Sequence, residues 1–404
     1  MLRPLSTLVG RGGRRPGWGL LVLFLTFCQS TKVLDEKTGR AAGAKTDGPS
    51  GYYFDDMARY LGGFDIPSDS KLAPFTQGPE YAQHRNSMAV FWEKTRAHSI
   101  TPVSEWRETT LFRNPNGTVC REDRPAIYPM SGADLINLYN ICPYASEYVM
   151  VALEKAGDIP HPENQTAQYY RNLSDMRAVI GNIAQRNYFS SVFMRAKIVN
   201  NREIPGIAPV LLAFASGLGW RIVDMEKFHL GEGGKVIIDE VTSEQKPRGV
   251  RIWFRVEGDK RLRSLTYIEQ YLNAQSAEQT HPLYQFFQQR KGSMILFKAA
   301  SYVMHNPAMV PVRDMFIGVS DYVVQDDSGF RYLDMAPAFE VSVYGYYRTP
   351  VRLGDAFFRN YAPQPELAAL YAERNPPDLP FHFGYGSLRR PPRSNLIVAH
   401  RRQG

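Results

Sequence analysis

The chain has 404 residues, of which 44% are hydrophobic and 22% are charged. These values are ordinary for a globular protein of sufficient length to bury a large core, so they exclude an intrinsically disordered chain. The formal charge of +8 does not indicate nucleic-acid binding, because four of the excess positive charges come from arginines in the acid-free first 28 residues. We therefore expect no nucleic-acid partner.

Residues 1–28 have the pattern of a signal segment for export. An arginine-rich lead precedes the apolar run LLVLFLTFC, which ends at Cys28 and is too short to span a bilayer. Polar residues follow at once, as they do after the lipidated cysteine of a bacterial lipoprotein, although Phe27 stands where a small residue is usual. We expect lipidation of Cys28. An uncleaved anchor, a signal peptide without lipid and an organellar transit peptide are the alternatives.

The chain after Cys28 divides into a tether and a folded body. Residues 29–50 are small and polar, which is typical of a flexible tether. Residues 51–404 are expected to form a single large α/β domain or two closely packed lobes. The first part of this body, residues 51–115, is predicted to be helical and rich in loops.

Residues 125–157 follow the order strand, polar turn, helix and second strand, which predicts a Rossmann-like β-α-β unit. In such folds the first turn contacts the ligand, and an acid after the second strand binds a ribose hydroxyl. Ser131, Gly132 and Asp134 supply the turn, and Glu154 supplies the acid. A dinucleotide fingerprint has three glycines, and this turn has one. The competing interpretation is therefore that Ser131 and Asp134 only cap the helix.

The rest of the body alternates between helical and strand patterns. The alternation predicts an α/β fold with a mixed or mostly parallel sheet flanked by helices. In chain order we expect a helical region at 158–200, a helix running into a strand at 206–228, strands at 235–242 and 249–258, a strand or helix at 261–272, a buried strand entering a helix at 292–306, a helix ending in a polar turn at 311–329, a strand at 339–350 and a proline-rich closing region at 360–404.

The segment FKAASYVMHN carries a candidate catalytic group. If the segment is helical, Lys298, Ser301, Tyr302 and His305 share one face of the helix. Lys298 or His305 would then act as a base, and Ser301 would need an orienting acid from elsewhere in the fold. A purely structural role for this stripe is the alternative.

The segment VSDYVVQDDSG gathers polar groups at the predicted end of a helix, namely Gln325, Asp326, Asp327 and Ser328. Negative charge is unfavourable at a helix C-terminus, so the two aspartates suggest a role in binding a polar ligand or a divalent cation, or in acid catalysis. The histidines are scattered without the spacing of a metal site. The sequence identifies no particular metal or cofactor.

Cys120 and Cys142 are the two cysteines of the body. In an oxidising compartment they are candidates for a disulfide. A buried free thiol at Cys142 is the alternative, because this residue lies on the core side of a predicted helix.

Three blocks resemble those of an uncharacterised family of bacterial secreted or lipid-anchored proteins. The blocks are SG-x-D at residues 131–134, KAASY-x-MH at residues 298–305 and QDDSG at residues 325–329, and the resemblance spans roughly residues 75–385. The resemblance implies the same compartment and suggests that the three polar blocks converge on one site. It implies no established activity.

We therefore predict an exported, lipid-anchored cell-envelope protein, facing the periplasm or the cell surface, that binds a small polar ligand in a cleft built from these blocks. The alternative is an extracytoplasmic hydrolase or transferase, with Lys298 or His305 as the base and Asp326 or Asp327 as an acid or metal ligand. A nucleotide-dependent or methyl-donor-dependent Rossmann-like enzyme is a third possibility, and the export signal argues against it.

Overall fold

The fold is seen in a computed structural model, which describes residues 51–113, 119–164, 166–186, 203–238, 247–347, 360–388 and 393–403, together with residue 197. The predicted signal segment, the tether of residues 29–50 and the lipidation site at Cys28 lie outside the described residues. Among the described residues, no helix has both the length and the apolar character needed to cross a membrane.

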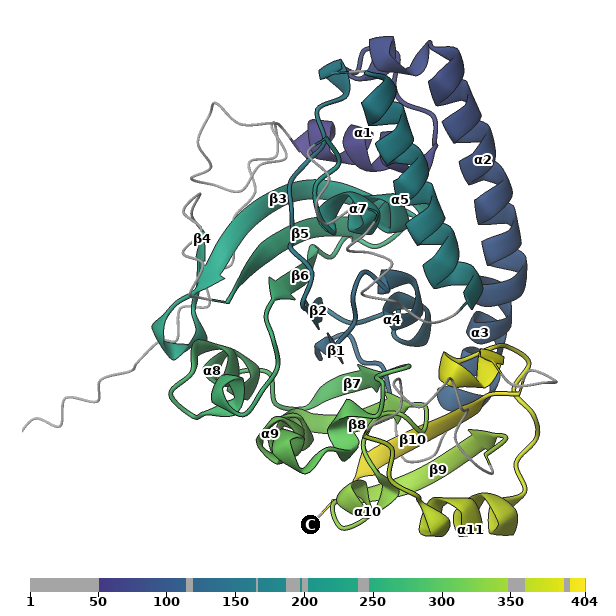
Figure 1. The fold of residues 1–404 in the computed structure, drawn as a ribbon, viewed down its shortest axis with the longest axis vertical. Coiled ribbons are helices and arrows are strands. Elements are labelled where there is room, and N and C mark those ends of the chain that lie inside the picture. The colour runs from purple at the N-terminus through teal and green to yellow at the C-terminus, as the bar shows by residue number, and fades with distance from the viewer. Residues whose placement is uncertain are drawn as a thin grey trace, which may run out of the picture.

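Ten strands form one mixed sheet in the order β4-β3-β5-β6-β2-β1-β7-β8-β10-β9 (Figure 1). The central strands β6, β2, β1, β7 and β8 are parallel to one another, and the strands on either side of them pair antiparallel. The strands are β1 Ala126–Pro129, β2 Glu147–Ala152, β3 Trp220–Leu230, β4 Val236–Ile238, β5 Arg248–Val256, β6 Arg263–Glu269, β7 Ser293–Phe297, β8 Ser320–Gln325, β9 Phe339–Gly345 and β10 Asn395–Arg401.

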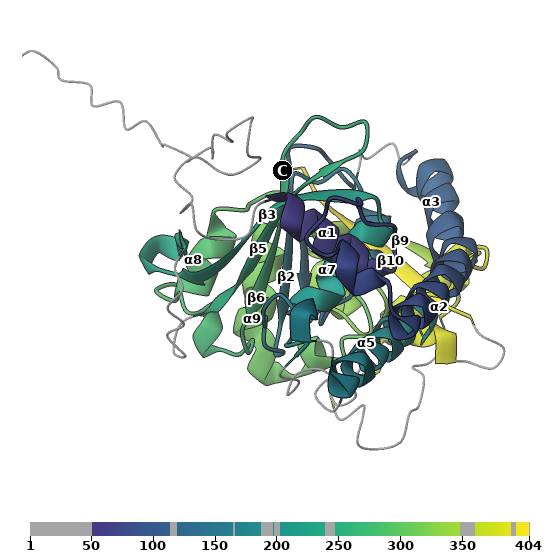
Figure 2. The ribbon, with the colours of Figure 1, turned by 90° about the horizontal axis from the view of Figure 1, so that it is seen from above.

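Helices cover both faces of the sheet (Figure 2). One face packs against α1 Gly51–Gly62, α2 Pro79–Thr95, α3 Thr101–Trp106, α4 Leu135–Ile141, α5 Ala167–Arg186 and α7 Ala208–Gly217. The other face packs against α8 Pro282–Gln288, α9 Val310–Val319, α10 Tyr332–Met335 and α11 Pro365–Arg374. An α/β sandwich of this kind buries the central strands on both sides.

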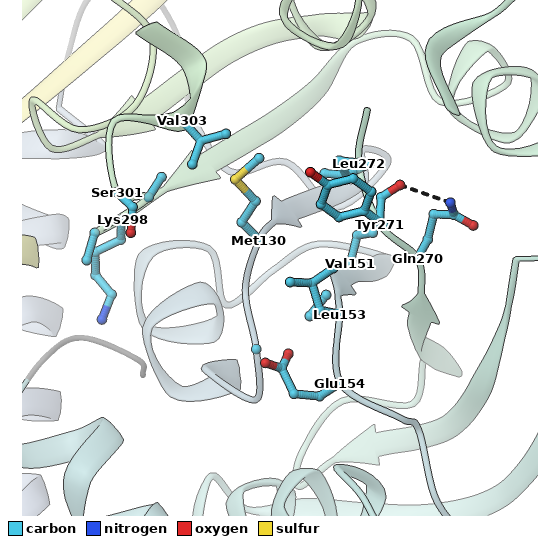
Figure 3. A pocket seen from close by; sticks show the side chains of 14 residues that line it. Met130, Val151, Leu153, Glu154, Gln270, Tyr271, Leu272, Lys298, Ser301 and Val303 are labelled. Atoms are coloured by element: carbon cyan, nitrogen blue, oxygen red, sulfur yellow. Dashed lines mark hydrogen bonds between the residues drawn. The ribbon is translucent and has the colours of Figure 1, made fainter. Parts of the chain in front are cut away.

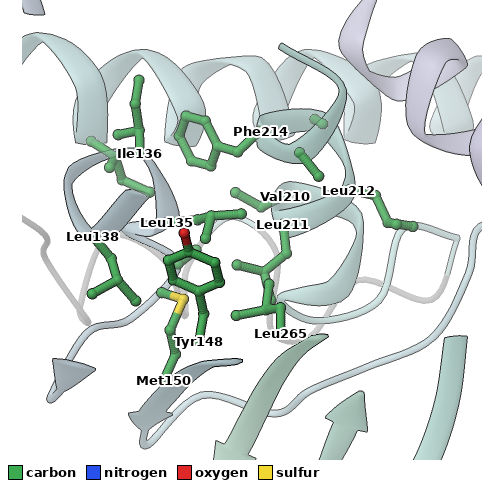
Figure 4. Close-up of a cluster of buried hydrophobic side chains, with 14 of the residues drawn as sticks. Leu135, Ile136, Leu138, Tyr148, Met150, Val210, Leu211, Leu212, Phe214 and Leu265 are labelled. Atoms are coloured by element: carbon green, nitrogen blue, oxygen red, sulfur yellow. The ribbon is translucent and has the colours of Figure 1, made fainter. Parts of the chain in front are cut away.

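The two cores follow from the alternation of side chains along each strand. In β2, Tyr148 and Met150 join the core beneath α4 and α7, whereas Val149 and Val151 join the core on the opposite face. Figure 4 shows Tyr148 and Met150 packed against apolar residues of α4 and α7, including Leu135. Because successive residues of a strand point to opposite faces, a continuous apolar run is what a doubly covered strand requires.

The order of the parallel strands reverses between β1 and β7. From β1 the chain builds β2 and β6 on one side, and it then returns to build β7 and β8 on the other side. β1 and β7 are in register at only two positions, Ala126 with Met294 and Ile127 with Ile295. Ligands of open α/β sheets bind at such a reversal, outside the carboxyl ends of the strands.

Most of the predicted elements are confirmed, and the α/β class is correct. β1, α4 and β2 form the predicted parallel unit, and the predicted helix-to-strand segment at 206–228 becomes α7 and β3. The ambiguous segment at 261–272 contains strand β6, which pairs with β2 and β5. The proline-rich closing region contains β10, a central partner of β8 and β9 that the sequence did not predict.

Two predictions about local structure were wrong. Residues 298–302 are not helical, and only Val303–His305 form a short 3-10 turn, so the proposed helical stripe does not exist. Asp326 and Asp327 follow strand β8, not a helix, because helix α9 already ends at Val319. The unfavourable helix-end charge that suggested a function for these aspartates is therefore absent.

Cys120 and Cys142 form a disulfide, which was one of the two alternatives that the sequence left open. Both residues are buried. Since Cys142 directly follows α4, the bond ties the end of this helix to the segment that precedes β1.

Candidate functional site

A cavity of about 240 Å³ lies where the strand order reverses, at the carboxyl ends of β1, β2, β6 and β7 (Figure 3). Its walls come from short segments that follow each of these four strands. The lining residues are Met130, Gly132, Val151, Ala152, Leu153, Glu154, Gln270, Tyr271, Leu272, Lys298, Ala299, Ala300, Ser301 and Val303. The site is therefore assembled from residues far apart in the sequence by the topology of the sheet.

Glu154 supplies a buried carboxyl group to the cavity wall. It follows the end of β2 by two residues, and its exposed fraction is only 1%. The hydroxyl of Tyr267 donates a hydrogen bond of 2.8 Å to the backbone carbonyl of Glu154, which fixes the chain at this point. The carboxyl group points toward the turn that follows β1 (Figure 3). The position is the one predicted for an acid that binds a ribose hydroxyl.

Apolar side chains on the same side of the cavity reach solvent. Leu153 is 43% exposed, and Tyr271, which lies two residues after the end of β6, is 62% exposed. Large apolar groups at the rim of a cavity offer a surface for the flat face of a ring. The sequence did not predict Tyr271, because the segment that contains it fitted both a strand and a helix.

A buried ion pair joins the first and second polar blocks. Lys298 Nζ lies 2.7 Å from Asp134 Oδ2, with side chains that are 1% and 0% exposed. Asp134 also caps α4 by accepting a hydrogen bond of 3.4 Å from the backbone N–H of Asn137. Tyr128 donates a further hydrogen bond of 3.2 Å to Asp134 Oδ2. Burial, together with the nearby Asp134 carboxylate, raises the pKa of Tyr128 well above its usual value. Tyr128 therefore stays protonated and able to donate.

Strained backbone is concentrated beside the cavity. Among the described residues, five non-glycine residues have positive φ, and four of them are Met130 (58°), Ala299 (50°), Ser301 (52°) and Tyr302 (54°). The fifth, Asn375, directly follows α11, where a left-handed residue is ordinary. Each such residue costs about 1–3 kcal/mol and persists only where the surrounding structure imposes its conformation, and such residues cluster at functional sites.

The third block holds the strained loop in place. Asp326 Oδ2 accepts a hydrogen bond of 3.1 Å from the backbone N–H of Ala299, and Ser328 Oγ accepts one of 2.7 Å from Ala300 N–H. The Tyr302 hydroxyl donates to Asp327 Oδ2 over 2.9 Å. Burial raises the pKa of Asp326, although the hydrogen bond from Ala299 N–H favours its ionised form. Both aspartates are 1% exposed and neither lines the cavity, so their contacts support the cavity wall from behind.

Ser301 presents its hydroxyl group at the wall formed after β7. Ser301 Oγ lies 3.1 Å from the hydroxyl oxygen of Tyr385, and Tyr385 donates a hydrogen bond of 3.0 Å to the carbonyl of Ala299. The backbone N–H of Tyr385 donates to Asp326 Oδ2 over 3.1 Å. A segment of the proline-rich closing region, which the sequence did not connect with the site, therefore reaches the loop at 299–301.

Other predicted site residues lie behind the cavity or away from it. Ser131 is fully buried and its backbone N–H donates to the carbonyl of Val151. Gln325 closes a turn through two hydrogen bonds with the backbone of Phe330.

Burial lowers the pKa of His305 to about 4, and His305 Nδ1 accepts a hydrogen bond of 3.3 Å from Ala362 N–H. His305 does not line the cavity.

The three polar blocks thus meet, as the resemblance suggested, but their roles differ. Gly132, Glu154, Lys298 and Ser301 line the cavity, whereas the remaining predicted residues lie outside its lining. Within the described part of the chain, no group of three or more histidine, cysteine, aspartate or glutamate residues is arranged to hold a metal ion.

Comparison of the chain with models of known protein families, with curated proteins and with solved structures finds no match. A functional proposal therefore depends on the geometry of the site.

Proposed function

We propose that the cavity binds a nucleoside-type ligand, with the ribose hydroxyls on Glu154 and the base against Leu153 and Tyr271. The observation that carries the proposal is the buried carboxyl group of Glu154 at the carboxyl end of β2, in a cavity at the reversal of strand order. In α/β folds this combination is typical of a ribose site.

The chemistry of the cavity supports the same ligand. A carboxylate has two oxygens that accept hydrogen bonds, and the two neighbouring hydroxyls of a ribose are matched donors. Beyond Glu154, Leu153 and Tyr271 provide exposed apolar surface on which a flat base would stack.

The proposed compartment is the cell envelope, with a lipid anchor at Cys28. The support is the sequence of residues 1–50 and the disulfide between Cys120 and Cys142, since disulfides persist in oxidising compartments. Labelling of intact cells with a palmitate analogue tests the anchor. Label that is retained in a Cys28→Ser variant, or absent from the wild type, contradicts it.

The hydrolase alternative has no specific observation in its favour. Lys298 is paired with Asp134, and Asp326 and Asp327 are hydrogen-bonded to the loop at 299–302. His305 is outside the cavity. The rival acid and base groups therefore do not meet a common reacting atom.

Isothermal titration calorimetry of the full chain with adenosine and with S-adenosylmethionine, and with glucose for comparison, tests the proposal. We expect heat of binding with at least one nucleoside and none with glucose. The variant Glu154→Gln keeps the size of the side chain and removes the carboxylate. Since hydrogen bonds to charged groups contribute about 1.5–3 kcal/mol, its affinity should fall about tenfold or more.

The matched control is Glu366→Gln, which changes an exposed carboxyl group on α11. It should bind as the wild type does. Thermal unfolding of both variants separates a loss of binding from a loss of folding. An unchanged affinity of folded Glu154→Gln would refute the ribose site.

A further inference from the structure

We infer that the cavity selects nucleosides that carry no phosphate and that have a hydrogen-bond donor, a hydroxyl or an amino group, at the 5′ end. The inference rests on the proposed nucleoside site and adds the class of ligand. It follows from what already occupies each position around the cavity that could bind an anion.

The orientation of the ligand comes from the order of the strands. The base would lie at the β6 side, where Tyr271 is, and the ribose would lie on Glu154 after β2. The 5′ end then points across β1 toward the loop after β7, which contains Lys298 and Ser301. In a nucleotide this is where the phosphate would be.

The first candidate anion position is the beginning of α4, and the protein fills it with its own carboxylate. Asp134 accepts hydrogen bonds from the backbone N–H and the side-chain amide of Asn137, at 3.4 and 2.7 Å. Phosphate sites at this place in α/β folds use backbone N–H groups that are open to the ligand. Here the Asp134 carboxylate already accepts from the backbone N–H of Asn137, and its charge is balanced by Lys298, so this N–H group is not open to a phosphate.

The second candidate position is the left-handed loop after β7, whose backbone N–H groups could form an anion-binding concavity. Those of Ala299 and Ala300 already donate to Asp326 Oδ2 and Ser328 Oγ, at 3.1 and 2.7 Å. These two N–H groups therefore donate to acceptors behind the cavity wall and are not open to a phosphate in the cavity.

The third candidate anion position is beside the ammonium group of Lys298. Lys298 is the only basic residue among the described residues that line the cavity. Its ammonium group is 2.7 Å from Asp134 and its side chain is 1% exposed, so its charge is already compensated. A phosphate at the 5′ position would lose its hydration and find no compensating charge.

The direction of one hydrogen bond shows what the 5′ end should offer instead. A tyrosine hydroxyl has one proton, and that of Tyr385 is used in the bond to the Ala299 carbonyl. In the contact of 3.1 Å between the two hydroxyls, Ser301 is therefore the donor and Tyr385 the acceptor. Within the described part of the chain no group donates to Ser301 Oγ when Ser301 is the donor to Tyr385, so its lone pairs can recognise a donor such as a hydroxyl or an amino group.

The test is calorimetry on the full chain with three probes, namely adenosine, adenosine 5′-monophosphate and 5′-amino-5′-deoxyadenosine. We expect adenosine and the amino compound to bind with similar affinity, and the monophosphate to bind at least tenfold more weakly. A monophosphate that binds as tightly as adenosine overturns this inference and leaves the nucleoside site intact. Failure of all three probes to bind overturns both.

The variant Asp134→Asn identifies the source of the selection. It leaves the charge of Lys298 without its compensating carboxylate, and the asparagine can still cap α4. The ratio of the monophosphate Kd to the adenosine Kd should fall severalfold, whereas an unchanged ratio contradicts the role of Asp134.

A second variant keeps the test decisive if Asp134→Asn does not fold. Ser301→Ala should weaken adenosine about three- to tenfold, the range for one neutral hydrogen bond. It should weaken the amino compound, whose amine is protonated at neutral pH, at least as much and leave the weak monophosphate unaffected. Equal losses for all three probes would indicate a structural role of Ser301 and would overturn its part in recognition.

Discussion

The two ends of the parallel strands both contain charged networks, partly buried at the amino end and fully buried at the carboxyl end, yet only the carboxyl end has the features of a site. At the amino end, Arg290 forms two hydrogen bonds with Glu147, the first residue of β2, at 2.8 and 3.0 Å. Arg251 lies 3.8 Å from the same carboxylate, and Thr266 donates to it over 3.2 Å. At the carboxyl end, Lys298 pairs with Asp134 beside the cavity.

The difference lies in the backbone. At the amino end, Glu147, Arg251 and Thr266 belong to regular strands, and the arginines compensate the partly buried charge of Glu147 directly. At the carboxyl end, Asp326 instead accepts a hydrogen bond from the backbone N–H of Ala299 in a left-handed loop. Buried charge alone therefore does not mark a functional site. Buried charge that holds strained backbone around a cavity is a more specific sign of a functional site.

The largest expected effect in this comparison comes from breaking the buried pair beside the cavity. Lys298→Met leaves the carboxylate of Asp134 buried without its cation, and the free energy of unfolding should fall by about 3–5 kcal/mol. Urea unfolding of the full chain measures it. In the control, Lys71→Met changes an exposed lysine and should cost less than about 0.5 kcal/mol.

The double variant Asp134→Asn/Lys298→Met separates charge from packing. Since it leaves no uncompensated charge, it should recover most of the stability lost in Lys298→Met. If the single lysine variant is as stable as Lys71→Met, the buried pair does not contribute to the difference between the two ends.

A change of pH should have an intermediate effect on stability. The contributions of Glu147 at the amino end and Asp326 at the carboxyl end should change with pH in opposite directions. Burial alone would raise the pKa of Glu147, but Arg290 and Arg251 outweigh it and leave that pKa below its usual value. Its contribution to stability is therefore present above about pH 4.3 and is lost as the pH falls through the lowered pKa. Burial raises the pKa of Asp326, so its contribution is present below about pH 3.9 and is lost as the pH rises through the raised pKa.

Urea unfolding between about pH 3 and about pH 7 gives the stability of the wild type, Glu147→Gln and Asp326→Asn. The differences from the wild type show how each contribution changes with pH. The stability advantage of the wild type over Glu147→Gln should grow with pH, by about 1.4 kcal/mol for each unit of pKa shift. Its advantage over Asp326→Asn should shrink with pH. Parallel pH profiles for the two variants would remove the distinction.

The parts of the fold that the sequence predicted are those that local patterns determine. The apolar runs around residues 126–129 and 147–152, with a polar turn between them, predict β1, α4 and β2, and they place Glu154 correctly after β2. The clustering of polar residues in three blocks indicated two segments that contribute residues to the cavity lining, Gly132 from the first block and Lys298 and Ser301 from the second. These features depend on neighbouring residues and on burial, which the sequence displays directly.

The parts that the sequence did not predict depend on contacts between distant segments. A helix was expected at residues 298–305, but Ala299, Ser301 and Tyr302 are left-handed because Asp326 and Ser328 hold the loop. The rim residue Tyr271 could not be assigned until β6 was placed beside β2. Tyr385 reaches the site from a segment without any strand or helix pattern. Tertiary hydrogen bonds override local propensity in each case.

The smallest expected effect tests whether the backbone beside the cavity is strained, which is the feature that separates the two ends. Ala299 has a φ of 50°, a conformation that glycine adopts without cost. Ala299→Gly should therefore raise the free energy of unfolding by about 0.5–1 kcal/mol, the reverse of the usual effect. In the control, Ala368→Gly within helix α11 should lower it by about 1 kcal/mol. Urea unfolding of the two variants measures the contrast in sign. A loss of stability in both would mean that the loop after β7 stores no strain, and the carboxyl end would then differ from the amino end only by its cavity.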